Sequence, residues 1–161
     1  MSTRGAIGIR FNNIDKVGYN HCDSYPTGLG NSILKFLQRY SIEQLQNIYN
    51  YIEFSDSSDD WGWDWDNNCF CSTFYDRLDF LYDSLFCEYA YIINLDSQTL
   101  EFYKGFNKNP NAEGRYANIK SDDDNEYYGV ELIQEIPLSE ISAYETYEDD
   151  TGTGFRKKKD N

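Results

Sequence analysis

The sequence is short of basic side chains, of histidine and of long apolar runs. Lys and Arg number 14 against 28 Asp and Glu, which gives a formal net charge of −14, and His21 is the only histidine. Because phosphate backbones and anionic membranes attract positive charge, this balance excludes a nonspecific nucleic-acid or membrane binder. No run approaches the roughly 18 apolar residues of a membrane-spanning helix, and no signal pattern opens the chain. We therefore expect a cytoplasmic protein.

None of the four cysteines stands in a metal or redox motif. Cys69 and Cys71 form a C-x-C, not the C-x-x-C of zinc knuckles and redox sites, and Cys22 stands beside His21. We expect small, partly buried thiols in a reducing compartment, not disulfides. We predict neither a metal site nor a cofactor.

Aromatic residues are abundant, with 15 Tyr, 10 Phe and 3 Trp making up 17% of the 161 residues. Disordered acidic chains are usually poor in aromatics, so this chain can build a core. The length fits one domain, which we place at 1–147, before a flexible charged tail over 148–161. Charge is uneven: residues 1–40 carry five basic and two acidic side chains, whereas residues 41–103 carry 13 acidic ones and only Arg77.

Alternation of apolar and polar residues predicts two β-hairpins. In the first, Ile7, Ile9 and Phe11 share one face, a turn follows, and a return strand runs over 17–21. The second hairpin spans 88–95 and 99–106. A long polar loop over 107–126 then leads to a last strand over 130–136.

Helical spacing of apolar residues predicts three helices. The first begins near Asn31 or Ser32, and the second begins at Ser41, where Ser41 and Gln44 fit a capping box. The third is expected from about Thr73, with four apolar residues facing inward: Phe74, Leu78, Leu81 and Leu85. The fold class is therefore α+β: a mostly antiparallel sheet of two hairpins plus a C-terminal strand, with about three helices packed on one side.

Three stretches resemble a family of small uncharacterised bacteriophage and prophage proteins. They are STRG at 2–5, DKVGYNHCDSYPTGLG at 15–30, and FCEYAYIINLD at 86–96 with LEFYKGF at 100–106. The resemblance covers both hairpins and the loop after the first. It implies a setting in the cytoplasm of an infected bacterial host, where interference with a defence system is plausible, and it carries over no catalytic residue.

The segment 55–68, which we call the acidic aromatic loop, is the main candidate for binding a partner. Carboxylates along it can imitate the phosphates of nucleic acid, and tryptophans are common anchors at protein interfaces. The predicted partner is a host protein with a basic surface, bound without catalysis. Alternatively, the segment is a solvated surface with its tryptophans folded onto the core. The residues expected to contact the partner are Asp56, Asp59, Asp60, Trp61, Trp63, Asp64, Trp65 and Asp66.

A second hypothesis places a small-molecule site near the N-terminal hairpin, which binds or cleaves a nucleotide-like signal. Arginines there could meet an anion beside a Gly-containing turn and helix start, with a tyrosine stacking on a base. The G-x-G at 28–30 lacks the spacing of a Rossmann or Walker loop. Alternatively, the arginines pair with acids and the polar cluster at 19–25 is local turn structure. The residues of this hypothetical site are Arg4, Arg10, Tyr19, His21, Asp23, Tyr25, Gly28 and Gly30.

Overall fold

The computed structural model describes residues 2–120 and 125–160. Its main sheet has five strands in the order β2-β1-β7-β8-β9. These strands are β1 (Gly5–Phe11), β2 (Ile14–Asn20), β7 (Tyr89–Asn94), β8 (Thr99–Lys104) and β9 (Glu131–Pro137). The α-helices are α1 (Asn31–Leu37) and α2 (Ile42–Tyr51), and short helical turns are η1 (Pro26–Gly30), η2 (Leu78–Tyr82) and η3 (Leu138–Ala143). Short strands are β3 (Glu53–Phe54), β4 (Trp63–Asp64), β5 (Cys69–Phe70), β6 (Thr73–Phe74), β10 (Tyr144–Asp149) and β11 (Gly152–Lys157).

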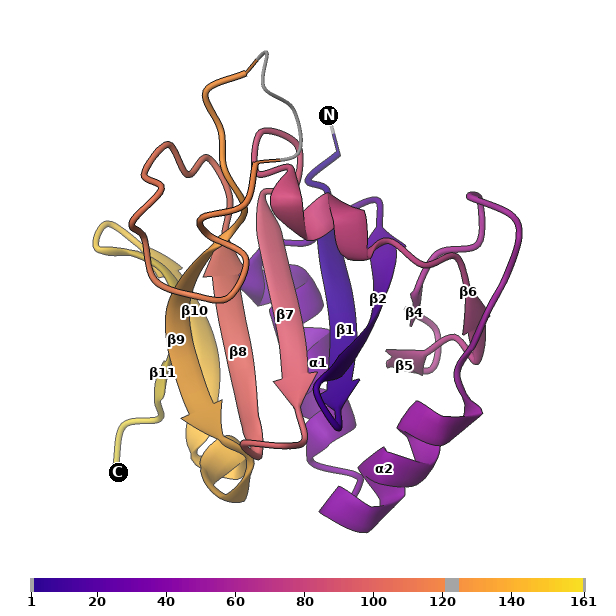
Figure 1. The fold of residues 1–161 in the computed structure, drawn as a ribbon. Helices are drawn as coiled ribbons and strands as arrows, with labels where there is room; N and C mark the ends of the chain where they lie inside the picture. The colour runs from indigo at the N-terminus through magenta and orange to yellow at the C-terminus, as the bar shows by residue number, and fades with distance from the viewer. Residues whose placement is uncertain (1, 121–124, 161) are drawn as a thin grey trace.

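Both predicted hairpins form, and β9 adds antiparallel to β8, so the α+β fold with a mostly antiparallel sheet is confirmed. The hairpins join through β1 and β7, which lie side by side in the centre and run parallel, with Gly5 opposite Tyr89 and Arg10 opposite Asn94 (Figure 1). Parallel pairing brings the N-terminal ends of the two strands to one edge of the sheet and their C-terminal ends to the other.

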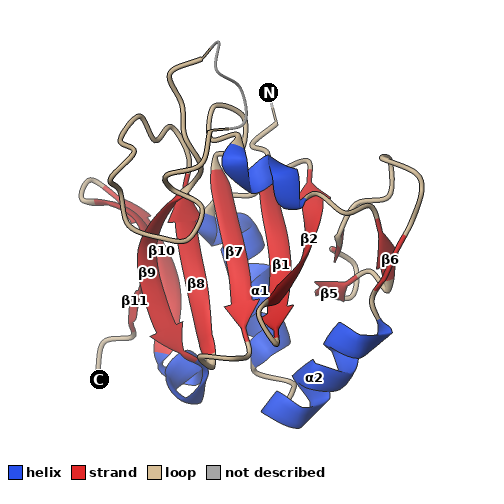
Figure 2. Cartoon of the chain, viewed as in Figure 1, coloured by secondary structure: helices blue, strands red, loops and turns tan. Residues whose placement is uncertain are grey.

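The two faces of the sheet are covered by different elements. α1 lies behind the sheet in the view of Figure 2, and its Ile33 packs in one core cluster with Ile7 and Ile93, which point to that face. The front face carries η2 and the coil that precedes β9, and Leu81 and Tyr116 pack there with Ile92. Both faces are therefore buried. Successive side chains of a strand point to opposite faces, and β1 and β7 have apolar residues at successive positions, so both faces of these strands need a cover.

The expected third helix from Thr73 is wrong. Phe74 pairs with β3 and belongs to the core behind the sheet, whereas Leu81 belongs to the core in front of it. The chain therefore passes from one face to the other within this segment, and residues that must enter different cores cannot share one helical stripe. Only the 3₁₀ turn η2 forms there, in front of the sheet and not on the side of α1 and α2.

α1 begins at Asn31, as expected, but only α2 is capped as the sequence predicts. At α2, Gln44 N–H donates to Ser41 Oγ at 3.2 Å and Ser41 N–H donates to Gln44 Oε1 at 2.8 Å, so the capping box is confirmed. At α1, neither Asn31 nor Ser32 caps the helix, because η1 runs directly into it. Ser32 instead accepts a hydrogen bond from Trp63 Nε1 at 2.8 Å.

The prediction of a flexible tail over 148–161 is wrong for most of that segment. β10 and β11 pair as an antiparallel hairpin, and Phe155 is buried beside Phe102 with ring centroids 5.5 Å apart. Gln134 both donates to and accepts from the Phe155 backbone, which fixes the hairpin to β9. Pairing with β10, burial of the Phe155 ring and the two Gln134 hydrogen bonds together order a segment whose charge suggested a tail.

The described parts of the long loop over 107–126 contain turns and no helix or strand. They are nevertheless fixed to the sheet, because the buried Asn107 side chain donates to the carbonyls of Ala117 and Gly129, and Tyr116 is buried in the front core. Residues 121–124 of this loop lie outside the described residues.

Candidate functional site

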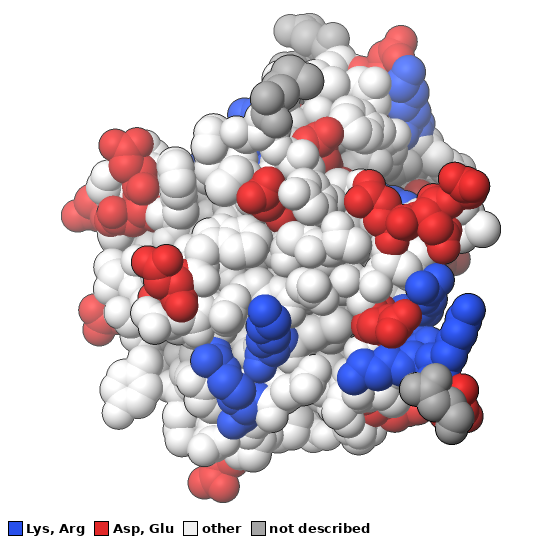
Figure 3. Space-filling view, turned by 180° about the vertical axis from the view of Figure 1, so that it is seen from behind, with Lys and Arg blue, Asp and Glu red and all other residues white. Residues whose placement is uncertain are grey.

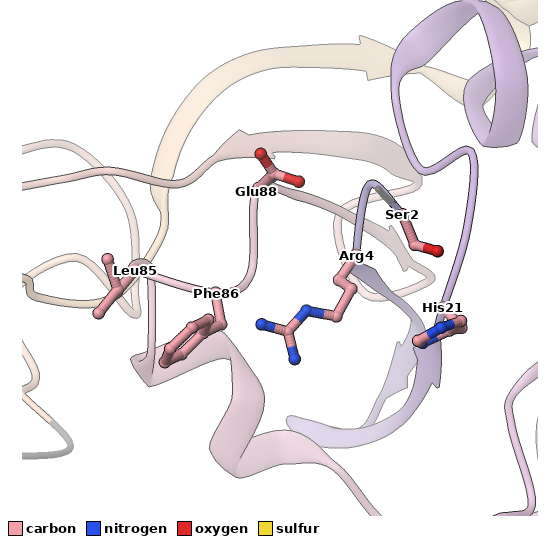
Figure 4. Close-up of a pocket in the computed structure, with 6 residues that line it drawn as sticks. All are labelled: Ser2, Arg4, His21, Leu85, Phe86 and Glu88. Atoms are coloured by element: carbon pink, nitrogen blue, oxygen red, sulfur yellow. The ribbon is translucent and has the colours of Figure 1, made fainter.

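A pocket of about 520 Å³ lies at the edge of the sheet where β1 and β7 begin (Figure 4). Arg4 directly precedes β1 and Glu88 directly precedes β7, and Glu88 N–H donates to the Arg4 carbonyl at 3.1 Å. Parallel pairing of β1 and β7 therefore brings these two charged residues together. We call this cavity the Arg4 pocket, and its lining residues are Ser2, Arg4, His21, Leu85, Phe86 and Glu88.

The Arg4 guanidinium rests on an aromatic ring. Its Cζ lies 4.6 Å from the centre of the Phe86 ring, within the range of a cation–π contact. Phe86 is 46% exposed although it is a large apolar residue, and it stands in the connection between η2 and β7. The pair forms a partly apolar wall of the pocket that carries a positive charge.

His21 joins the Arg4 pocket to the acidic aromatic loop. Its ring stacks on Trp61 with centroids 5.2 Å apart and an angle of 18° between the planes, and its Nδ1 lies 2.9 Å from the Tyr19 hydroxyl. Trp61 is 46% exposed, and His21 is exposed as well. The two sites predicted from sequence therefore meet, since His21 was expected in one and Trp61 in the other.

The acidic aromatic loop is held against β2 by close backbone contact. Gly62 N–H donates to the Tyr19 carbonyl at 3.0 Å, and a Cβ placed on Gly18 would lie 2.6 Å from the Gly62 Cα. Only glycine permits this approach of two backbones. Residues 63–70 then turn back as the short β4–β5 pair, so this part of the segment is more regular than a loop.

The three tryptophans of the loop have different environments. Trp63 is 5% exposed, packs edge-on against Phe36 and Phe70, and belongs to the core, so its expected role in a partner surface is wrong. Trp65 is 37% exposed and its Nε1 donates to Asn20 Oδ1 at 3.1 Å. Trp61 and Trp65 are therefore available at the surface, and Trp63 is the anchor that holds the segment.

The carboxylates of the loop also divide into two kinds. Asp64 accepts hydrogen bonds from Asn67 Nδ2 at 2.8 Å and from the Asp66 and Asn67 backbone amides. The side-chain bond from Asn67 is the main reason that the Asp64 pKa lies below its usual value, so this residue shapes the turn. The other carboxylates are exposed and make no ion pair with any residue that the structure describes: Asp56, Asp59, Asp60 and Asp66.

Charge on the surface is grouped. Seen from behind, acidic side chains gather at both sides of the molecule, one of them the side that carries the acidic aromatic loop in Figure 1, and most of the basic side chains lie in the lower half (Figure 3). No ion pair within the described ranges joins a basic residue of 1–40 to an acidic residue of 41–103.

Arg10, expected in the ligand site, lies at the opposite end of β1. Its Nη1 donates to Asp15 Oδ2 at 3.0 Å, and that oxygen also accepts from the Tyr116 hydroxyl at 2.9 Å. The contacts continue through Arg115 to Glu101, which is 1% exposed and accepts from two guanidinium nitrogens at 2.6 and 2.7 Å. We call this group the carboxylate network: Arg10, Asp15, Asn94, Glu101, Tyr103, Arg115 and Tyr116.

The Gly-containing turn does not line the Arg4 pocket either. A Cβ on Gly28 would lie 2.4 Å from the Asp23 carbonyl, and one on Gly30 would meet Phe155 at 3.1 Å, so both glycines serve packing. The Tyr25 hydroxyl donates to Asp23 Oδ1 at 3.1 Å, and this bond raises the pKa of Tyr25. Of the residues predicted for a ligand site, only Arg4 and His21 line the cavity, with Tyr19 behind His21.

Sequence reasoning missed Leu85, Phe86 and Glu88 as pocket residues. The sequence predicts Leu85 on the inner face of a helix and Glu88 at the start of a hairpin strand, and Phe86 belongs only to the stretch that resembles phage proteins. Their position depends on which strand lies beside β1, and alternation within a strand carries no information about its neighbour. The resemblance was the only signal that singled out 2–5, 15–30 and 86–96 together.

Comparison of the chain with protein-family models, with curated proteins and with solved structures found no match. Among residues 2–120 and 125–160, no group of three or more His, Cys, Asp or Glu side chains is arranged to hold a metal ion. None of the helices in the described part of the chain is both long and apolar enough to cross a membrane.

Proposed function

We propose that this protein is a non-enzymatic binding protein, which attaches to a protein with a basic surface through the acidic aromatic loop. The observation that carries the proposal is Trp61: it is 46% exposed, yet its ring is stacked on His21 and stands next to the backbone contact between Gly62 and Tyr19. A large aromatic held in place at the surface loses little conformational freedom on binding and is the commonest kind of interface anchor.

Charge around Trp61 supports a basic partner. Asp59 and Asp60 directly precede Trp61 and are exposed, and neither is paired within the described parts of the chain. Unpaired carboxylates at the edge of an interface steer an oppositely charged partner and make its association sensitive to salt. In this proposal, Trp61 provides most of the affinity, and the carboxylates raise the rate of association and favour basic partners over others.

The resemblance to bacteriophage proteins leads us to propose a host protein as the target, with an effector of a defence system as the first choice. If that target binds nucleic acid, the exposed carboxylates of the loop occupy the place of phosphates. Asp64 is not part of this surface, because its carboxylate is already bonded within the turn.

A second candidate function, binding of a small molecule near the N-terminal hairpin, is supported by the Arg4 pocket. Its nucleotide-specific form has little support, because Arg10 is paired with Asp15 and the glycine turn does not line the cavity.

Capture from a bacterial host lysate tests the proposed function. We expect the wild type to retain a basic protein that is released by salt, and Trp61→Ala to retain at least about tenfold less of it. Charge reversal at Asp59 and Asp60 should also reduce capture, and the remaining capture should fall less steeply as salt rises, because the attraction that salt screens has been removed.

A matched control changes charge elsewhere. Glu148→Lys with Asp150→Lys alters two exposed acids on and after β10 and should leave capture unchanged. Equal capture by wild type, Trp61→Ala and the Asp59 and Asp60 reversal, all shown to be folded by circular dichroism, would reject the proposal.

A further inference from the structure

The Arg4 pocket contains two opposite charges that do not neutralise each other. The Arg4 and Glu88 side chains both line it, yet they form no ion pair with one another, nor with any other residue in the described ranges. Figure 4 shows the guanidinium extending toward Phe86 while the Glu88 carboxylate lies on another side of the pocket. Arg10, Arg77, Arg115 and Arg156 all pair with acids, and Arg39 donates to the Asn68 carbonyl, so an arginine without such a partner is unusual in this chain.

The position of Phe86 explains why the two charges stay apart. The guanidinium lies over its ring at 4.6 Å, which attracts the cation through the face of the ring and leaves the N–H groups at the edge free to donate. No oxygen of the described residues accepts a hydrogen bond from the Arg4 side chain. A planar guanidinium with free edges is suited to a carboxylate.

The rest of the cavity is suited to an apolar group. Leu85 and Phe86 contribute aliphatic and aromatic surface to the lining, and the volume of about 520 Å³ lies within the usual range for small-molecule sites. The stacked His21 closes one side. The cavity thus offers one cation, one anion and an apolar wall.

We propose that the Arg4 pocket binds a zwitterionic small molecule of the α-amino acid type with an apolar side chain. Its carboxylate lies against Arg4, its ammonium group faces Glu88, and its side chain packs on Leu85 and Phe86. A nucleotide fits less well, because several phosphate charges would face a single arginine and a carboxylate. This site does not depend on the proposed macromolecular partner.

Calorimetric titration with three related probes tests the proposal on the full chain. Leucine carries both charges, N-acetylleucine lacks the ammonium group, and leucinamide lacks the carboxylate. We expect leucine to bind at least about tenfold more tightly than either of the others, because each loses one charge pair.

Two variants test which residue binds which charged group of the ligand. Arg4→Gln should remove the preference for leucine over leucinamide, and Glu88→Gln should remove the preference for leucine over N-acetylleucine. Lys159→Gln and Glu148→Gln, at exposed positions outside the pocket, are the controls and should bind as the wild type does. If Arg4→Gln does not fold, Arg4→Lys, which keeps the charge without the planar fork, should bind leucine several-fold more weakly.

The proposal is overturned if leucine shows no binding up to about 50 mM, where even a weak site would be detected. It is equally overturned if leucine, N-acetylleucine and leucinamide bind alike, or if Arg4→Gln and Glu88→Gln leave the preferences unchanged. The Asp59 and Asp60 reversal separates this site from the proposed function, since it should reduce partner capture while leucine binding persists.

Discussion

Arg4 and Arg10 stand at opposite ends of the same strand and have opposite fates. Arg10, at the C-terminal end of β1, is paired with Asp15 at 3.0 Å within a partly buried network of charges. Arg4, at the N-terminal end, rests on Phe86 and has no carboxylate partner among the described residues. The two ends of β1 therefore differ in the pairing of their arginines. One arginine forms an ion pair within the molecule, and the other remains available to a ligand.

The comparison separates stability from binding. At the network end, coil residues Arg115 and Tyr116 cover the sheet and satisfy Glu101 and Asp15. At the pocket end, no comparable segment among the described residues covers Arg4 and Glu88, and a cavity remains. Buried charges must be paired to be tolerated, whereas partly exposed charges can remain free at little cost.

The largest expected effect is that of removing a carboxylate from the network. Glu101→Ala leaves Arg115, the Tyr103 hydroxyl and the Asn94 amide without their shared acceptor, so we expect the free energy of unfolding to fall by about 3 kcal/mol or more. Urea denaturation followed by tryptophan fluorescence measures it.

Glu88→Ala is the matched change at the pocket end. It should alter the free energy of unfolding by no more than about 0.5 kcal/mol, because the Glu88 side chain makes no hydrogen bond or ion pair with the described residues, and its backbone hydrogen bonds remain in the variant. Equal losses of unfolding free energy in Glu101→Ala and Glu88→Ala would contradict the view that only the network end of β1 stabilises the fold through its charges.

A smaller difference is expected between the arginines themselves. Arg10→Met removes a donor from the buried Asp15 carboxylate, whose other oxygen already lacks a partner in the described part of the molecule, so we expect a loss of about 2 kcal/mol. Arg4→Met keeps an apolar stem over Phe86 and should stay within about 0.5 kcal/mol of the wild type. Chemical denaturation of both variants under one set of conditions decides the matter, and a larger loss from Arg4→Met would refute the assignment.

The smallest effect concerns Tyr103, whose hydroxyl donates to Glu101 at 2.9 Å. Burial, and then the charge of Glu101, raise its pKa above the usual value near 10. Because the folded state keeps this proton longer than the unfolded state does, its contribution is present below about pH 10 and is lost as pH rises further.

Tyr103→Phe should therefore cost about 1 kcal/mol at neutral pH and make the loss of stability above about pH 10 less steep. Tyr51→Phe, at a position 79% exposed, is the control and should leave the slope unchanged. Thermal unfolding across this pH range measures both, and an unchanged slope for Tyr103→Phe would contradict the role of the network.

Much of the fold was predictable because its signals are local. Alternation in 7–11 and 88–106 placed both hairpins, and the Ser41 and Gln44 pair placed the start of α2. The failures at Thr73 and at 148–161 have one cause. Phe74 and Phe155 are apolar residues whose burial depends on cores built by distant strands, and a local pattern does not reveal which core they enter.

The candidate site was half predictable. Arg4, His21 and Trp61 were singled out from residue type, but in two separate sites, and Trp63 was expected at the surface. Only the contact between β2 and the acidic aromatic loop shows that Trp61 lies on His21 while Trp63 lies in the core.

The sequence by itself determined the hairpins, the capped helix, the apolar faces and the acidic aromatic loop, since periodicity and turn chemistry act over a few neighbouring residues. Only the tertiary structure decided that β1 and β7 lie side by side and parallel, because strand edges pair through backbone groups that every sequence carries. That one pairing brings Arg4 beside Glu88 at one end of the sheet and Arg10 beside Asn94 at the other. It is therefore the pairing that creates both the pocket and the carboxylate network.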